Sequence, residues 1–316
     1  MADHDLGGFD PPIDQPPARS RRRRNLVIAA AVLLVLAVVA AISWWPSSDD
    51  PVAAPGTTRP PSTTTTKVKK LPSGTVEIAT AKATLNELDV FAAEPPEWAT
   101  APAAHVPSDV PVPPQSQPSA PDREPLPDKG APIVGREVTE TGWRFANPGP
   151  YEPAQPFTML VQERRGEWLR VHVPVRPNGT TGYVRTADVD LSQTQYRVEL
   201  YLGERTLRVF DGPGQLVETK VVIGSPFTPT PTGTFYITDI VPQTSPSYAP
   251  FALATNGYSE VMNEFDTGVP VVALHGTNHP EQVGEARSNG CVRIPNEIVQ
   301  QLADTLPQGT PVYIFP

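Results

Sequence analysis

Proline is the residue that most limits how this chain can fold. The chain has 41 prolines among its 316 residues, whereas proline makes up about 5% of ordinary globular proteins. Two stretches, residues 46–73 and 94–132, are rich in proline and show no hydrophobic periodicity. Proline interrupts helices and central strands because it lacks a backbone N–H. We therefore predict a solvated linker at 46–73, a long loop at 94–132, and a folded part smaller than the length suggests.

The segment before the linker has the length and composition of a membrane span. Leu26–Ile42 contains no polar residue, and with the next three residues it makes about 30 Å of helix, enough to cross a bilayer. Arg21–Arg24 precede it directly, and basic residues beside a span stay in the cytoplasm. We predict a cytoplasmic basic tail at 1–24, a transmembrane helix at 25–45 and all later residues outside the cytoplasm. The alternative is a cleaved signal peptide, whose apolar region is shorter and ends at small residues rather than at Trp-Trp-Pro.

The charge balance excludes one class of partner. The formal net charge is −9 at pH 7. A chain this acidic does not attract nucleic acid or other anionic polymers by electrostatics. We therefore expect no nucleic-acid partner.

Short alternating segments predict a first β-domain at residues 74–190. The runs 75–81, 157–177 and 179–189 alternate apolar and polar residues around turns such as RRGE and PNGT, which is the pattern of short antiparallel strands. We expect a small β-barrel that contains the proline-rich loop. Its segments GEWLRVHVP and GTTGYVRTADV resemble the SH3-like domains that precede catalytic domains in bacterial cell-wall enzymes. The resemblance leaves open whether the domain is a plain spacer or a wall-binding module.

A second all-β domain is predicted at residues 194–316. Residues 196–224 and 233–241 again alternate apolar and polar residues around turns that contain Gly and Pro. Only residues 296–306 have helical spacing, with an apolar face and Asn296 as the expected N-cap. The predicted fold class is therefore mainly β, ending in a β-sandwich with one helix.

Residues 244–268 look too irregular for a core element. They carry four large aromatic side chains, Tyr248, Phe251, Tyr258 and Phe265. We interpret the segment as a flap or the wall of a groove. The alternative is that the aromatic rings pack at the edge of a sheet.

The single cysteine of the chain, Cys291, has no partner for an internal disulfide. Outside the cytoplasm it is then free, bridged to another molecule, or reactive. A buried strand predicted at 269–274 delivers His275 to a sheet edge, where Gly276 permits a tight turn. An imidazole within hydrogen-bond reach can accept the proton of a thiol, whose ordinary pKa is about 8.5, and so make it a nucleophile. Backbone N–H groups at Gly290 and Cys291 would suit a developing oxyanion.

Two other interpretations of these residues remain open at this point. Cys291 could be a small buried apolar residue and His275 a core histidine with satisfied hydrogen bonds. A zinc site made by His275, His279 and Cys291 would lack a second cysteine and a fourth ligand. We expect neither a metal nor a cofactor.

Three segments, taken together, resemble one family. HGT at 275–277, SNGCVRIPN at 288–296 and TPTPTGTFYI at 228–237 are similar to the L,D-transpeptidase catalytic (YkuD-like) domain, over about residues 194–316. The resemblance implies that Cys291 is the nucleophile and His275 its base. The predicted site further contains, as catalytic residues, Gly290 and Ser288 and, as substrate contacts, Arg293, Asn289, Asn296, Tyr248, Phe251, Gly276 and Thr277.

Three positions of the motif leave a role to be settled. Asn289 stands where many family members have histidine, so the role of its side chain is open. Gly276 offers no side chain to orient His275, and we expect a backbone carbonyl to do so. Arg293 could hold a substrate carboxylate or lower the pKa of the thiol, or it could be a solvated strand residue.

The resemblance also implies a reaction and a location. The thiolate would attack the carbonyl before the terminal D-residue of a peptidoglycan stem tetrapeptide, and the amine of an acceptor stem would then resolve the thioester into a 3→3 crosslink. A β-lactam of the carbapenem type is the expected covalent inhibitor. The protein would be a single-pass cell-membrane protein facing the cell wall. The alternatives are a thiol-dependent L,D-carboxypeptidase or other peptidoglycan hydrolase, and a catalytically inactive wall-tethering protein.

Overall fold

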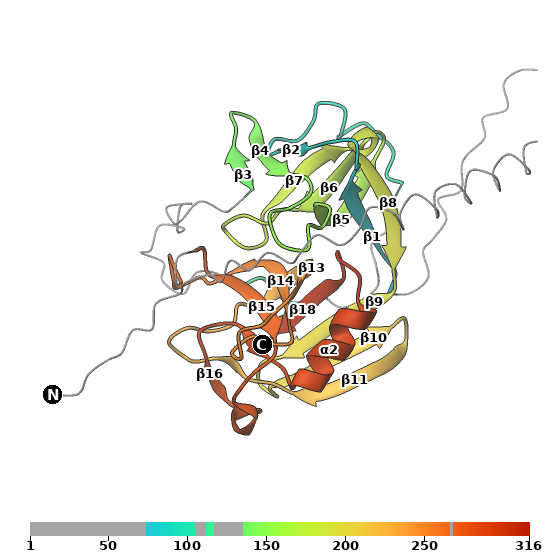
Figure 1. The fold of residues 1–316 in the computed structure, drawn as a ribbon. Coiled ribbons are helices and arrows are strands. Elements are labelled where there is room, and N and C mark those ends of the chain that lie inside the picture. Colours follow the sequence, from blue (N-terminus) through green and yellow to red (C-terminus); the bar gives the residue numbers. More distant parts are fainter. Residues whose placement is uncertain (1–73, 105–111, 117–134, 266–267) are drawn as a thin grey trace, which may run out of the picture. The chain divides into compact units, whose positions relative to one another are not determined.

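The computed structural model describes residues 74–104, 112–116, 135–265 and 268–316 (Figure 1). The described residues all lie in one unit of the chain, Thr65–Pro316. The predicted basic tail, transmembrane helix and linker therefore lie outside the described residues. Among the residues that are described, no helix is long and apolar enough to cross a membrane.

The first part of the described chain forms one antiparallel sheet of eight strands. The strands are β1 (Val76–Ala81), β2 (Glu87–Phe91), β3 (Arg136–Val138), β4 (Gly142–Ala146), β5 (Thr158–Arg165), β6 (Trp168–His172), β7 (Thr181–Arg185) and β8 (Val189–Thr194), with a 3₁₀ turn η1 (Thr186–Asp188) before β8. Their order across the sheet is β3-β4-β2-β7-β6-β5-β1-β8. The short antiparallel strands expected in 157–177 and 179–189 are confirmed. The SH3-like resemblance of this sheet stays a prediction.

The second part forms another eight-stranded sheet. Its strands are β9 (Tyr196–Tyr201), β10 (Thr206–Asp211), β11 (Gly214–Lys220), β13 (Gly233–Pro242), β14 (Phe251–Tyr258), β15 (Val271–His275), β17 (Val292–Arg293) and β18 (Pro311–Phe315), in the order β11-β10-β9-β18-β13-β14-β15-β17. Two pairs are parallel, β9 with β18 and β15 with β17. A separate parallel pair joins β12 (Ile223–Gly224) to β16 (Ala286–Ser288), and a 3₁₀ turn η2 (Pro280–Gln282) precedes β16.

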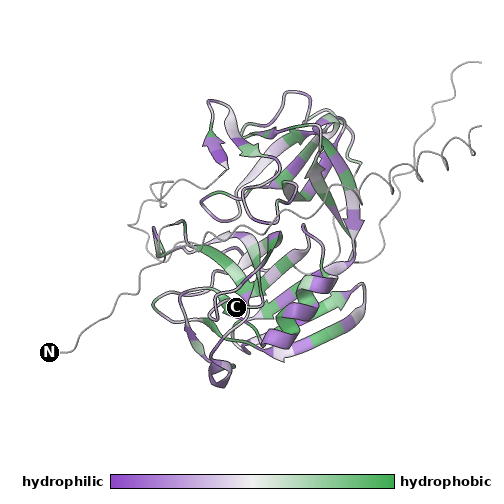
Figure 2. Cartoon of the chain, in the orientation of Figure 1, coloured by the Kyte–Doolittle hydropathy of each residue, from purple (hydrophilic) through white to green (hydrophobic). Residues whose placement is uncertain are grey.

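One α-helix, α2 (Asn296–Thr305), packs on the second sheet, as predicted. Its residues Val299 and Leu302 are buried in the same apolar cluster as Leu274, and apolar and polar residues alternate around the helix (Figure 2). The expected N-cap is wrong in detail, because Asn296 is the first helical residue and no side chain caps the helix. The side chain of Asn296 instead accepts a hydrogen bond from the backbone N–H of Thr277, at 2.8 Å.

The prediction that residues 244–268 contain no core element is wrong. Strand β14 runs through the segment, between β13 and β15 in the sheet. Its polar residues Thr255 and Asn256 are buried, which hides the alternation expected of a strand. They can be buried because both are hydrogen-bonded: Thr255 donates to the carbonyl of Val272 at 2.6 Å, and Asn256 accepts from the N–H of Tyr236 at 2.9 Å.

The two sheets contact each other through buried side chains. Tyr236, on β13 of the second sheet, lies in the apolar cluster of the first sheet, and its hydroxyl donates to the carbonyl of His172 at 3.3 Å. Gln155, which precedes β5, bonds both backbone groups of Ile240, each at 3.0 Å. The second sheet is therefore held against the first by apolar packing and by hydrogen bonds.

The packing of α2 predicts a difference between two leucines. Leu302 is 1% exposed and Leu216, on β11, is 48% exposed. Leu302→Ala leaves a cavity and is expected to lower the free energy of unfolding by about 2–5 kcal/mol. The matched change Leu216→Ala is expected to cost about 0.5 kcal/mol or less. Thermal or denaturant unfolding of both variants measures the difference, and similar losses in the two would contradict the packing described here.

Candidate active site

The parallel pairing of β15 with β17 arranges the central residues of the site. In this pairing Leu274 lies opposite Val292 and His275 opposite Arg293. Leu274 and Val292 are buried in the core of the second sheet. Because neighbouring residues of a strand point to opposite faces, His275 and Arg293 point to the other face. The predicted strand 269–274 is thus observed as Val271–His275, and His275 ends it as expected.

A tight turn, residues 288–291, presents Cys291 just before β17. Ser288 holds the turn closed, because its hydroxyl accepts the N–H of Gly290 at 3.2 Å and donates to the carbonyl of Cys291 at 2.6 Å. Gly290 has φ of 115°, in the region that favours glycine. The N–H of Gly290, expected as an oxyanion donor, is engaged by Ser288 in this structure. Ser288 therefore acts on the shape of the turn.

Two threonines of the TPTPTG segment hold the same turn from outside. The hydroxyl of Thr228 donates to the carbonyl of Ser288 at 3.0 Å, and that of Thr230 donates to the carbonyl of Gly290 at 2.8 Å. Thr230 also accepts the N–H of Gly224 at 2.9 Å. This segment was recognised only by its resemblance, and its role in supporting the turn was not foreseen.

His275 is 3% exposed and is oriented by its own backbone neighbour. Its Nδ1 lies 2.7 Å from the carbonyl oxygen of Gly276, which confirms the expected backbone partner. The carbonyl oxygen accepts a hydrogen bond from the Nδ1–H, so Nε2 is the unprotonated nitrogen of the neutral ring. The ring of Tyr248 lies 4.6 Å from the imidazole, centroid to centroid, at an angle of 43°. The hydrogen bond at Nδ1 and the contact with the Tyr248 ring therefore fix the orientation of the imidazole.

Burial keeps His275 neutral. Desolvation lowers the pKa of the imidazole to about 4, and the charge of Arg293 adds to this, while backbone hydrogen bonds with Gly276 and Ser247 act in the opposite direction. At neutral pH the ring is therefore uncharged. A neutral imidazole whose Nε2 is unprotonated is able to accept a proton at that nitrogen.

Cys291 is partly exposed and also neutral in the resting site. Burial of the sulfur raises the pKa of the thiol, while a backbone hydrogen bond from Ala273 and the charge of Arg293 act to lower it. The thiol donates to the carbonyl oxygen of Val271, with Sγ 3.6 Å from that oxygen. The resting site therefore holds a thiol and an imidazole, with the thiol turned to the backbone of β15.

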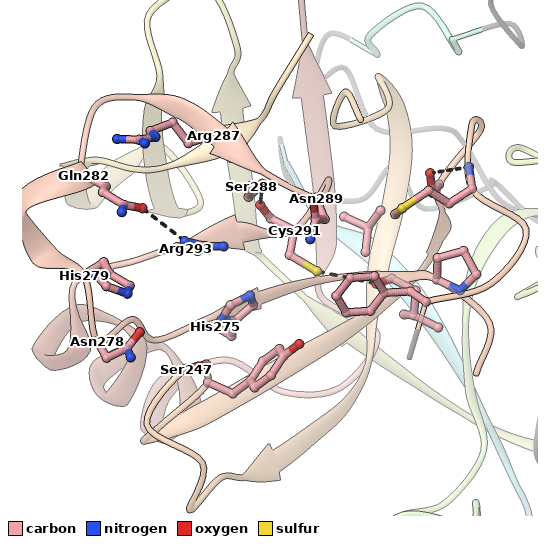
Figure 3. A pocket seen from close by; sticks show the side chains of 17 residues that line it. Ser247, His275, Asn278, His279, Gln282, Arg287, Ser288, Asn289, Cys291 and Arg293 are labelled. Carbon is pink, nitrogen blue, oxygen red and sulfur yellow. Dashed lines mark hydrogen bonds between the residues drawn. The ribbon is translucent and has the colours of Figure 1, made fainter. Parts of the chain in front are cut away.

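These residues surround a cavity of about 360 Å³ (Figure 3). Six of the predicted site residues line it: Cys291, His275, Ser288, Asn289, Arg293 and Tyr248. The remaining lining residues are Ser247, Ser259, Met262, Phe265, Pro270, Val271, Val272, Asn278, His279, Gln282 and Arg287. Apart from Phe265 and His279, these were not among the predicted site residues, because they come from β15, β16 and the neighbouring loops and carry no motif of their own.

Other predicted site residues do not line the cavity but pack next to the residues that do. Phe251 packs against the core of the second sheet. Gly276 approaches the backbone so closely that a Cβ there would lie 1.7 Å from the carbonyl oxygen of Ala249. Thr277 is buried. Its backbone N–H donates to the side-chain oxygen of Asn296, and its hydroxyl accepts the N–H of His279.

The far end of the cavity is polar. The guanidinium of Arg293 donates to the side-chain oxygen of Gln282 at 3.2 Å, and His279 lies 3.0 Å from the carboxylate of Glu281. In the part of the chain that the structure describes, no three His, Cys, Asp or Glu side chains are grouped so as to hold a metal ion.

The sequence of this part of the chain matches one family. Residues 195–314 match the L,D-transpeptidase catalytic domain, YkuD. The YkuD protein of Bacillus licheniformis, named for the L,D-transpeptidase activity proposed for it, is 31% identical over 121 residues, covering 38% of this chain and 66% of its own length. Its counterpart in Bacillus subtilis is 34% identical over 119 residues, covering 38% of this chain and 65% of its own length. The chain thus spans just under two thirds of these relatives.

Solved structures are similar as well. The catalytic domain of the Enterococcus faecium L,D-transpeptidase, determined by NMR, is 28% identical, and the match covers 38% of this chain and 96% of that domain, with a TM-score of 0.28. A TM-score this low supports no comparison of detail. The match of sequence over residues 195–314 identifies that part of the chain as a member of the L,D-transpeptidase catalytic domain family.

Proposed function

We propose that this protein is a peptidoglycan L,D-transpeptidase that forms 3→3 crosslinks through a thioester at Cys291. The proposal is carried by one arrangement: Cys291 and His275 line the same cavity, and the carbonyl of Gly276 holds Nδ1 of His275, so that Nε2 is the unprotonated nitrogen of the neutral ring. It is supported by the family of residues 195–314. The alternatives, a hydrolase or an inactive wall-tethering protein, use the same fold and are separated by the experiments below.

In the first half-reaction the thiol of Cys291 attacks the carbonyl before the terminal D-residue of a donor stem. Cys291 directly precedes β17, two residues before Arg293, which pairs with His275, and both side chains line the same cavity. The thiol must leave the carbonyl of Val271 and turn to Nε2, which accepts its proton. The same proton then passes to the amine of the leaving D-residue.

The oxyanion needs a donor that the turn leaves free. The N–H of Gly290 is used by Ser288, so we assign this role to the backbone N–H of Cys291. One such donor contributes about 3 kcal/mol in comparable sites. A stem peptide also carries carboxylates, and Arg293, whose side chain bonds the neutral Gln282, is suited to bind one of them. Asn289 is exposed beside the cavity and has no assigned part in the chemistry.

In the second half-reaction the side-chain amine of an acceptor stem attacks the thioester. His275 accepts a proton from this amine, and the sulfur leaves as the thiolate and is reprotonated. Attack by water instead of an amine would give the L,D-carboxypeptidase. Both outcomes pass through the same thioester, so only analysis of the products distinguishes them.

The location of the protein is part of the proposal. The apolar run Leu26–Ile42, its basic flank and the linker 46–73 support a single-pass membrane protein with its β-domains facing the cell wall. The first β-domain would then serve as a spacer or as a wall-binding module. A reporter fused after Pro316 is expected to be active only outside the cytoplasm, and a mature N-terminus near Ser47 would instead indicate a secreted enzyme.

The thioester predicts a covalent adduct at one residue. Incubation with a carbapenem, whose strained carbonyl resembles the scissile amide, is expected to add one molecule to the protein at Cys291, and none to Cys291→Ala. With donor and acceptor stem peptides, the same protein is expected to release 3→3 crosslinked product. Intact-mass spectrometry and product analysis measure both. An adduct on any other residue would contradict the nucleophile, and shortened stems without crosslinks would favour the hydrolase.

The states of the two central residues predict a pH dependence. His275 has a pKa of about 4, so it stays a base as the pH rises from about 6 to about 9.5, and acylation should show no loss from imidazole protonation in that range. His275→Ala is expected to lower acylation about 10²-fold or more near neutral pH. Part of this loss should return only at alkaline pH, because the pKa of the Cys291 thiol is raised.

His279→Ala is the matched control. His279 is half-exposed and bonds Glu281, so its loss is expected to change acylation by about a few-fold at most. Single-turnover acylation of both variants, with folding checked by thermal unfolding, makes the comparison. Equal losses in the two variants would show that His275 is not the specific base.

A further inference from the structure

A loop of the first sheet touches the wall of the catalytic cavity. Residues 173–180 connect β6 to β7, and they contact residues 258–262, which are the last residue of β14 and the four residues after it. Ser259 and Met262 of the second segment line the cavity. The loop lies outside residues 195–314, the part that matches the family. Any effect of this loop on the site therefore comes from a part of the chain outside the family match.

Asn178 bonds the backbone of the wall in two directions. Its side-chain oxygen accepts the N–H of Tyr258 at 2.9 Å, and its side-chain nitrogen donates to the carbonyl of Tyr258 at 2.8 Å. The same nitrogen lies 3.2 Å from the carboxylate of Glu260. A pair of bonds to the N–H and C=O of one residue is what a neighbouring antiparallel strand supplies. Asn178 thus takes the place of a strand partner where β14 ends.

Two further contacts fix the same segment. The hydroxyl of Tyr258, which is 3% exposed, donates to the carbonyl of Pro174 at 2.8 Å. The guanidinium of Arg176 donates to the carbonyl of Met262 at 3.0 Å and lies 5.6 Å from the centre of the Tyr258 ring. The loop therefore holds the wall at both ends, at Tyr258 and at Met262.

The wall is in turn connected to the nucleophile. Tyr258 pairs with Val271 in the β14–β15 ladder, and the N–H of Ser259 donates to the carbonyl of Pro270 at 2.9 Å. The carbonyl of Val271 is the group that accepts the thiol of Cys291. A displacement of the wall would therefore change the lining of the cavity beside the resting thiol.

We infer that Asn178 and Arg176 are positioning residues of the catalytic cavity, and that they fix the wall against which the donor stem peptide binds. This inference rests on the proposed function for its substrate. It makes the first sheet part of the catalytic apparatus, because its loop sets the shape of the site. Neither residue touches the reacting atoms, so their loss is expected to weaken donor binding more than it slows bond formation.

The test compares Asn178→Ala with Asn86→Ala in the full chain. Asn86 lies on the first sheet between β1 and β2, is exposed, and contributes only its backbone carbonyl to a hydrogen bond with Asn147. Asn178→Ala is expected to raise the half-saturating concentration of donor stem peptide about tenfold or more, with a smaller fall in the maximal acylation rate. Alkylation of Cys291 by iodoacetamide, which needs no wall, should stay within about twofold. Asn86→Ala should match the unaltered protein in all three measurements.

A second measurement does not depend on catalysis. Hydrogen exchange of the amides of residues 258–262 is expected to speed up about tenfold or more in Asn178→Ala, and to stay unchanged in Asn86→Ala. Arg176→Ala, which removes the bond to the carbonyl of Met262 at the other end of the wall, is expected to speed exchange in the same direction and serves if Asn178→Ala does not fold. Unchanged exchange and unchanged donor saturation would overturn the inference. Faster exchange without any acylation of the unaltered protein would overturn the proposed function and leave the positioning role standing.

Discussion

The parallel pairing of β15 with β17 is the constraint on which the site depends. Alternation along these two short strands sends Leu274 and Val292 into the core and turns His275 and Arg293 to the cavity. A shift of one residue would exchange the two sets, burying a guanidinium and exposing the core. The apolar residues therefore fix the register, and the register fixes the chemistry. A strand of only two residues, β17, can therefore fix which side chain faces the core and which faces the cavity.

Burial then decides the state of the reacting groups. Desolvation disfavours the charged form of both residues, so it raises the pKa of the thiol and lowers that of the imidazole. Arg293 acts on both pKa values in the downward direction, which favours the thiolate and disfavours the imidazolium. The resting pair is thus neutral, with the thiol turned to the carbonyl of Val271.

Much of the fold and of the site could be predicted from local pattern. Alternation predicted β1, β5, β6 and β7 of the first sheet and β9, β10, β11 and β13 of the second, but not β2, β3, β4 or β18. Helical spacing predicted α2, and the motifs around His275 and Cys291 predicted residues that line one cavity. Prediction from hydrophobic pattern failed where buried polar side chains are hydrogen-bonded inside the fold. Buried Thr255 and Asn256 conceal β14, and their partners are distant in sequence. The part that Ser288 plays in the turn could not be predicted for a similar reason, since only three-dimensional geometry shows that its hydroxyl bonds Gly290 and Cys291.

Two side-chain amides from the first part of the chain each bond the backbone N–H and C=O of one residue in the second sheet. Gln155 bonds both backbone groups of Ile240, and Asn178 bonds both backbone groups of Tyr258. Ile240 and Tyr258 lie toward the ends of β13 and β14, where backbone groups lose their partners in the ladder. Each such bond contributes about 0.5–1.5 kcal/mol net, but leaving the buried group unpaired would cost more. The two amides therefore both stabilise and order the strand ends, and one of these strand ends continues into the wall of the cavity.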